Sequence, residues 1–120
     1  MTWNGQERRK YPRANFACKL HILGAVGTLE LHTEDISAGG LRVTLCREMP
    51  AGTLVELKIF LTAGKVVECK GRIAWMVKAP DNVDRYSEIF TTGIEFDDIN
   101  DKDRQFICDL VEQVELTKAK

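Results

Sequence analysis

Apolar and polar side chains alternate with a period of two along most of the chain between Phe16 and Phe96. This period is typical of strands that bury one face. Glycine, proline, asparagine or aspartate separates the alternating runs, which are residues 16–22, 28–33, 41–45, 55–61, 66–77 and 89–96. Six short strands of this kind predict an antiparallel sandwich or barrel, and they argue against a parallel sheet covered on both faces.

The alternation also assigns side chains to the predicted interior. Trp75 is expected to point inward with its neighbours, and Gly71 marks an expected bend in the same strand. The alternation stops at Asp35 and begins again at Leu41. The inward set is Phe16, Cys18, Leu20, Ile22, Leu29, Leu31, Val55, Leu57, Ile59, Leu61, Val67, Cys69, Ile73, Trp75, Thr92, Ile94 and Phe96.

Near the end of the chain the spacing of apolar residues changes to three and four, which predicts an amphipathic helix over residues 99–117. Asn100 is the expected N-cap, and acidic residues follow it where the helix dipole favours them. The apolar stripe consists of Phe106, Ile107, Leu110, Val111 and Val114. We expect this helix to lie against the strands.

Composition limits the classes of partner. The chain has 120 residues, with 17 basic and 18 acidic side chains and a formal net charge of −1. This balance argues against a general nucleic-acid or membrane-surface binder, so an anionic partner must meet a local patch. No apolar run approaches the roughly 20 residues that span a bilayer. The polar start lacks the apolar core of a signal peptide, and a cytoplasmic protein is expected.

Neither a metal site nor a catalytic site is predicted. The four cysteines lie far apart in the sequence, without a CxxC pair, and are expected to be reduced and mostly buried. His21 and His32 fall at outward strand positions and lack neighbouring ligands at metal spacing. Ser37 has no histidine base in its motif, and no carboxylate pair stands out. We therefore expect a binding protein without a cofactor, rather than an enzyme.

The first stretch that departs from the strand pattern is basic. Residues 7–16 read ERRKYPRANF and place Arg8, Arg9 and Arg13 just before the first apolar run. Pro12 disfavours a continuous helix from Arg9 to Arg13, so these arginines are expected on a flexible, extended arm. Guanidinium groups offer a donor fork to phosphate oxygens and to guanine. A solvated basic tail is the alternative.

The second departure is EDISAGGLRV, residues 34–43. Gly39 and Gly40 can adopt positive φ and allow a ligand to approach the backbone. Asp35 can accept hydrogen bonds from the N–H edge of a guanine, and Ser37 can bond a phosphate. The alternative is an ordinary hairpin in which Asp35 and Ser37 bond their own backbone.

Together, the RxxxR stretch and the DxSxxG turn resemble the motifs of the PilZ domain family. The matching residues are Arg9 and Arg13, followed by Asp35, Ser37 and Gly40, and the later GRIAW and GIEF stretches are also similar. The resemblance covers residues 7–115. It implies an all-β fold with a C-terminal helix, namely a six-stranded antiparallel β-barrel. We expect one domain, with an arm over 1–15, a barrel over 16–97 and a helix over 99–117.

The resemblance further implies a cyclic di-GMP (c-di-GMP) receptor, in which Arg8, Arg9, Arg13, Asp35, Ser37, Gly39 and Gly40 form the ligand site. Such a receptor would signal to a protein partner by a conformational change, without nucleic acid and without entering a membrane. In the family, the position of Arg8 is linked to binding one ligand or a stacked pair, and an arginine there favours the pair. Two alternatives remain: a family member that binds no nucleotide, and a small barrel that binds single-stranded nucleic acid.

Overall fold

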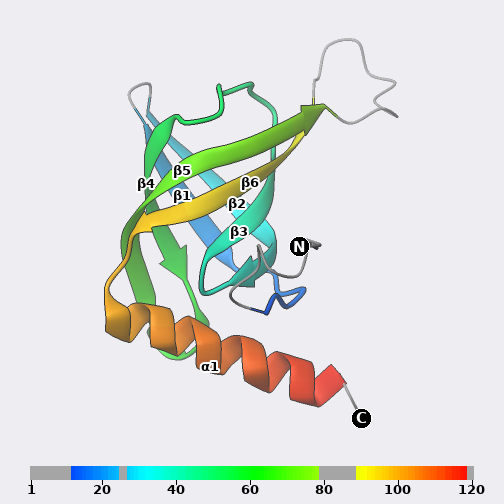
Figure 1. Cartoon of the computed structure of the whole chain (residues 1–120), viewed down its shortest axis with the longest axis vertical. Coiled ribbons are helices and arrows are strands. Elements are labelled where there is room, and N and C mark those ends of the chain that lie inside the picture. The colour runs from blue at the N-terminus through cyan, green and yellow to red at the C-terminus, as the bar shows by residue number, and fades with distance from the viewer. Residues whose placement is uncertain (1–11, 25–26, 79–88, 119–120) are drawn as a thin grey trace, which may run out of the picture.

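A computed structural model describes residues 12–24, 27–78 and 89–118 of the chain. The strands are β1 (Lys19–Gly24), β2 (Gly27–Ser37), β3 (Gly40–Leu45), β4 (Leu54–Phe60), β5 (Val66–Lys78) and β6 (Phe90–Asp98), followed by the helix α1 (Asp101–Lys118). A short 3-10 turn, Thr62–Gly64, connects β4 to β5. The strands close into a barrel in the order β1-β2-β3-β6-β5-β4, with each neighbouring pair antiparallel (Figure 1). The predicted six-stranded barrel with a C-terminal helix is confirmed.

The helix covers the lower end of the barrel in Figure 1, near the β2–β3 hairpin. Its buried residues Ile107, Leu110 and Val111 join the barrel interior in one apolar core. The predicted N-cap is also correct, since the backbone N–H of Lys102 donates to Asn100 Oδ1 at 2.7 Å. This bond satisfies one of the amide groups that the first helical turn leaves without a partner. Among the described residues, no helix combines the length and the apolarity that crossing a membrane requires.

The first strand begins later than its alternation predicts, at Lys19 rather than Phe16. The preceding residues are held against β2 by isolated contacts. Ala14 and Ile36 exchange two backbone hydrogen bonds of 3.0 Å. The Thr33 hydroxyl accepts from the Cys18 amide at 3.0 Å and donates to the Phe16 carbonyl at 2.7 Å. Because side-chain bonds replace part of the ladder here, the segment follows β2 without forming a regular strand.

The expected end of the second strand at Asp35 is wrong, because β2 continues to Ser37. The pairing of β2 with β3 shifts register between Thr33 and Asp35. Such a bulge adds one residue and reverses the alternation beyond it. Ile36 therefore remains in the core, fully buried, while Glu34 and Asp35 both lie on the outer face. The sequence pattern loses its period at this point because of the bulge.

The prediction that Trp75 points into the core is also wrong. A second register shift occurs in β5, between Ile73 and Trp75. Ile73 stays fully buried, whereas Trp75 turns to the outer face and is 39% exposed. Its indole lies over Gly93 of β6, where an added Cβ would be 2.3 Å from the ring. The register shift brings Met76 against the core in place of Trp75.

The cysteines differ in burial. Cys18 and Cys69 are buried as predicted, Cys108 is half-buried, and Cys46 is exposed, contrary to the expectation of mostly buried thiols. Burial raises the pKa of the Cys18 thiol. Burial, and to a smaller extent the nearby Asp103 and Asp98, raises the pKa of Cys69 to about 12.

We predict that a thiol reagent at pH 8 modifies Cys46 well before Cys18 or Cys69 in the folded protein. The thiolate is the reactive form, and pH 8 lies far below the raised pKa of Cys69, so that thiol stays protonated and shielded. Mass spectrometry of peptides after timed alkylation gives the order of modification, and the unfolded protein, in which all four cysteines react, is the control. Equal rates for Cys46 and Cys69 in the folded protein would contradict the assigned core.

Candidate functional site

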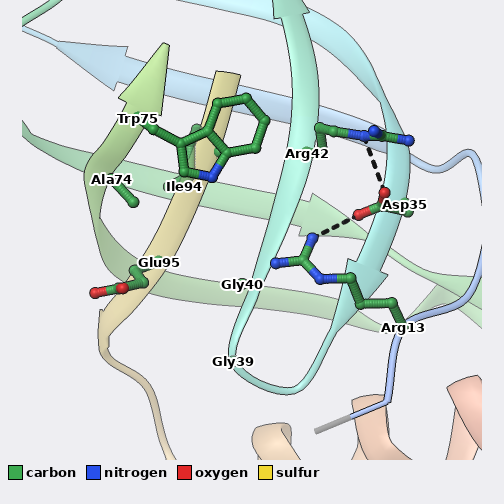
Figure 2. A pocket seen from close by; sticks show the side chains of 10 residues that line it. Arg13, Asp35, Gly39, Gly40, Arg42, Ala74, Trp75, Ile94 and Glu95 are labelled. Carbon is green, nitrogen blue, oxygen red and sulfur yellow. Dashed lines mark hydrogen bonds and ion pairs between the residues drawn. The ribbon is translucent and has the colours of Figure 1, made fainter. Parts of the chain in front are cut away.

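The carboxylate of Asp35 lies between two arginines on the outer face of the barrel. Arg13 Nη1 donates to Asp35 Oδ1 at 2.9 Å, and Arg42 Nε forms an ion pair with Oδ2, also at 2.9 Å (Figure 2). The Asp35 side chain is only 9% exposed. Charge-assisted contacts on both oxygens compensate the cost of removing this carboxylate from water.

Backbone pairing brings these three residues together. The Ala14–Ile36 bridge places Arg13 beside Asp35, although 22 positions separate them in the sequence. On the other side, Arg42 of β3 is the direct cross-strand partner of Asp35 in β2. Opposite charges at such a position attract one another across the pair of strands.

Arg42 also contacts a second acid. Glu34 Oε1 lies 3.5 Å from Arg42 Nε, and the Thr44 hydroxyl donates a hydrogen bond to Glu34. Among the described residues, no acceptor forms an aligned hydrogen bond with the buried Nε of Arg13 or of Arg42. Arg42 Nε thus meets Asp35 Oδ2 as an ion pair without the alignment of a hydrogen bond.

The turn between β2 and β3 is held by Ser37. The Gly39 amide donates to Ser37 Oγ at 3.1 Å, and the Ser37 hydroxyl points to the Gly40 carbonyl at 3.3 Å. Ser37 is buried and follows the turn-forming alternative. Asp35 does not follow that alternative, because its described partners are arginines.

The two glycines of the turn do not show the expected positive φ. Among the described glycines, positive φ angles belong to Gly27, Gly52 and Gly64. Gly40 has a steric role instead, because an added Cβ would lie 2.3 Å from the carbonyl oxygen of Ile94. This close approach lets β3 pair directly with β6 beside the turn.

A hollow of about 460 Å³ opens beside the Asp35 cluster. This volume lies in the range of small-molecule sites, roughly 300–1,000 Å³. Figure 2 shows Trp75 on one side of the hollow and the two arginines with Asp35 on the other. The lining residues are Arg13, Asp35, Gly39, Gly40, Arg42, Ala74, Trp75, Gly93, Ile94 and Glu95. The hollow is therefore lined by an indole ring and by paired positive and negative groups.

Two predicted site residues, Arg8 and Arg9, lie outside the described part of the chain. The structure does bring together Arg13, Asp35, Ser37, Gly39 and Gly40. No group of three or more histidine, cysteine or acidic side chains that could hold a metal ion occurs within the described residues. His21 lies on the outer face as predicted. The centroid of its ring is 4.8 Å from that of Phe60, and its Nε2 is 3.5 Å from Glu30 Oε2.

A comparison with protein-family models finds the PilZ domain over residues 7–113. The chain belongs to the PilZ domain family. No curated protein matches this PilZ domain, but solved structures do.

Three solved structures show the same fold as this PilZ domain. The inhibitor of motility MotI/DgrA of Bacillus subtilis has a TM-score of 0.81 at 22% identity, over 92% of this chain and 52% of that one. The PilZ domain of YcgR from Escherichia coli, solved with c-di-GMP, has a TM-score of 0.71 at 14% identity, over 92% and 94%. The MrkH–c-di-GMP complex of K. pneumonia has a TM-score of 0.74 at 14% identity, over 93% and 54%. This chain thus spans about half the length of MotI/DgrA and of MrkH.

Sequence reasoning missed six residues that line the hollow of this PilZ domain, and the charged or aromatic ones among them are Arg42, Trp75 and Glu95. Strict alternation assigns Trp75 to the core because it hides the bulge before this residue. The signal that could have corrected this assignment is Gly93, since a strand glycine often marks a close approach by another group. In the sequence, Arg42 occupies an ordinary outward position of a strand. Its contact with Asp35 becomes evident only when β2 and β3 are aligned.

We predict that Gly40→Ala destabilises this PilZ domain by about 1–3 kcal/mol, as expected for overpacking against atoms that cannot move aside. The new methyl group would meet the Ile94 carbonyl, which is part of the β3–β6 ladder. Urea denaturation measures the loss. Gly24→Ala is the matched control, because an added Cβ there meets nothing within 4 Å. Equal stability of the two variants would contradict the close β3–β6 packing.

Proposed function

We propose that this PilZ domain is a receptor for c-di-GMP, which it binds between the arginine arm and the β2–β3 turn. The observation that carries the proposal is the ion pair between Arg13 and Asp35 at the edge of the hollow. The half-exposed indole of Trp75 lines the other side of this hollow (Figure 2). The site residues proposed for the arm are Arg8, Arg9 and Arg13. On the barrel they are Asp35, Ser37, Gly39 and Gly40, to which the structure adds Trp75.

Each part of the ligand has a complementary group. Guanidinium forks of the arm bind the bridging phosphates. The carboxylate of Asp35 only accepts hydrogen bonds, and the N1–H and N2–H₂ groups of guanine only donate them at that edge. The indole of Trp75 offers a flat surface on which a base can stack, an interaction worth about 1–3 kcal/mol per base. Ser37 acts through the shape of the turn, and Gly39 and Gly40 leave the backbone open to the ligand.

Ligand binding then exchanges one ion pair for two new contacts. In the described structure Arg13 occupies Asp35 Oδ1. A ligand that gives a phosphate to Arg13 and a guanine edge to Asp35 leaves neither group uncompensated. A ligand with only phosphates satisfies the arginine but leaves Asp35 Oδ1 without a partner, which is unfavourable for a side chain so little exposed. The pair therefore selects a ligand that carries both chemistries.

The structural neighbours support this proposal. The PilZ domain of YcgR and the MrkH protein were both solved with c-di-GMP. We further propose that Arg8 supplies an additional fork, so that two stacked ligands bind to one chain. Because c-di-GMP is a bacterial second messenger, the domain would act in the cytoplasm as a non-enzymatic adaptor. Closing of the arm over the ligand would then change the surface that a protein partner contacts.

We predict that Arg9→Ala and Arg13→Ala each nearly abolish c-di-GMP binding, because each loses a charge-assisted contact worth roughly 1.5–3 kcal/mol. Isothermal titration calorimetry measures the affinity, and the equivalence point of the native titration counts the ligands, two if they stack. Arg72→Ala is the matched control, since Arg72 forms an exposed pair with Asp97 and does not line the hollow. Unchanged affinity after removal of both Arg9 and Arg13 would rule out the site.

We predict that Asp35→Ala lowers the preference for c-di-GMP over cyclic di-AMP as well as the affinity for c-di-GMP. A carboxylate that accepts from the guanine edge distinguishes the bases, whereas a phosphate contact does not. Titration of native and variant protein with both dinucleotides gives the ratio of affinities. If affinity for both ligands falls by the same factor, Asp35 shapes the site without reading the base.

A further inference from the structure

Arg42 is not part of either motif, yet it contacts the central carboxylate as closely as Arg13 does. Its Nε lies 2.9 Å from Asp35 Oδ2, and Arg13 occupies the other oxygen at the same distance. The two arginines thus divide the carboxylate between them, one oxygen each (Figure 2).

The backbones that carry the two arginines are held differently. Arg13 precedes the barrel and is next to Ala14, which pairs with Ile36 in an isolated bridge outside the strands. Arg42 lies within β3 and is paired on both sides, with Asp35 of β2 and with Gly93 of β6. Arg42 therefore keeps its place relative to Asp35 in any state in which the barrel stays closed, whereas Arg13 can leave without breaking the sheet.

The burial of Asp35 makes this difference important. When Arg13 turns to a phosphate, a carboxylate that is 9% exposed loses one of its two counterions. Leaving such a charge without compensation is strongly unfavourable, and the carboxylate would also be free to rotate away from the ligand. A second counterion fixed to the barrel removes both problems.

We propose that Arg42 is a positioning residue for nucleotide binding. It holds Asp35 Oδ2 in place and compensates its charge, so that Oδ1 can exchange Arg13 for the guanine edge. This inference rests on the proposed function. Within the described part of the chain, the charged groups around Asp35 are Arg13, Arg42 of β3 and Glu34 of β2, and Glu95 of β6 lines the same hollow.

The contact of Arg42 with Glu34 does not account for its position equally well. That distance is 3.5 Å, and both side chains are more than a third exposed, whereas Asp35 is nearly buried and closer. Exposed pairs of this kind contribute little. Glu34, which accepts a hydrogen bond from the Thr44 hydroxyl, therefore adds little to the placement of Arg42.

The test is a double-mutant cycle measured by calorimetry with c-di-GMP. Arg42→Met should weaken binding about tenfold, the size expected for one charge-assisted contact. Arg42→Lys, which restores the positive charge, should recover most of the affinity. In the Asp35→Ala background, Arg42→Met should change the affinity by less than about twofold, because the group that Arg42 positions is absent. Arg72→Met is the control for loss of an arginine elsewhere on the outer face.

The outcomes separate this inference from the function on which it rests. Absence of binding by the native chain would overturn both. If the native chain binds and Arg42→Met binds equally well, the positioning role alone is wrong. A tenfold loss that persists in the Asp35→Ala background would show that Arg42 contacts the ligand directly. This result would also overturn the positioning role. Should Arg42→Met fail to give a cooperative thermal transition, Arg42→Gln, which keeps a polar head group, replaces it in the same cycle.

Discussion

A nearly buried carboxylate has to be compensated, and in this PilZ domain the compensation of Asp35 connects the arm to the barrel. One oxygen is bound by Arg13, which precedes the first strand, and the other by Arg42, which lies inside the sheet. Because losing either counterion is unfavourable for a side chain so little exposed, the Arg13–Asp35 pair helps the Ala14–Ile36 bridge to hold this segment beside β2. On the proposed function, the same interaction also keeps Asp35 Oδ1 in place for a ligand with N–H donors.

The position of the carboxylate depends in turn on two irregularities of the barrel. The register shift at Thr33/Asp35 places Glu34 and Asp35 on the same outer face, while Ile36 stays in the core. The shift at Ile73/Trp75 turns the indole outward over Gly93. A regular barrel would have buried Trp75 and exposed Ile36. Bulges are typical next to binding sites because they redirect single side chains without disturbing the remaining sheet.

The sequence predicts the fold well, because one-sided alternation and the final helical period follow directly from burial of one face. It also singles out Arg13, Asp35 and the glycines of the turn, since these residues interrupt the pattern. It does not predict the role of Trp75 or Arg42, because both depend on strand register. Alternation alone cannot locate a bulge, and a cross-strand partner is unknown until two distant strands are aligned. Ser37 illustrates a further limit, since its motif position is compatible with a phosphate contact and with the turn bonds that the structure shows.

A structure of this PilZ domain with c-di-GMP, determined by crystallography, tests the central role of Asp35 most directly. We expect a guanine edge on Asp35 Oδ1, its ring against Trp75, phosphates on the arm arginines and the Arg42–Asp35 pair intact. Together these features would show that the ligand has replaced Arg13 at the carboxylate. A complex in which the Arg13–Asp35 pair persists and the ligand lies away from the hollow would contradict the account.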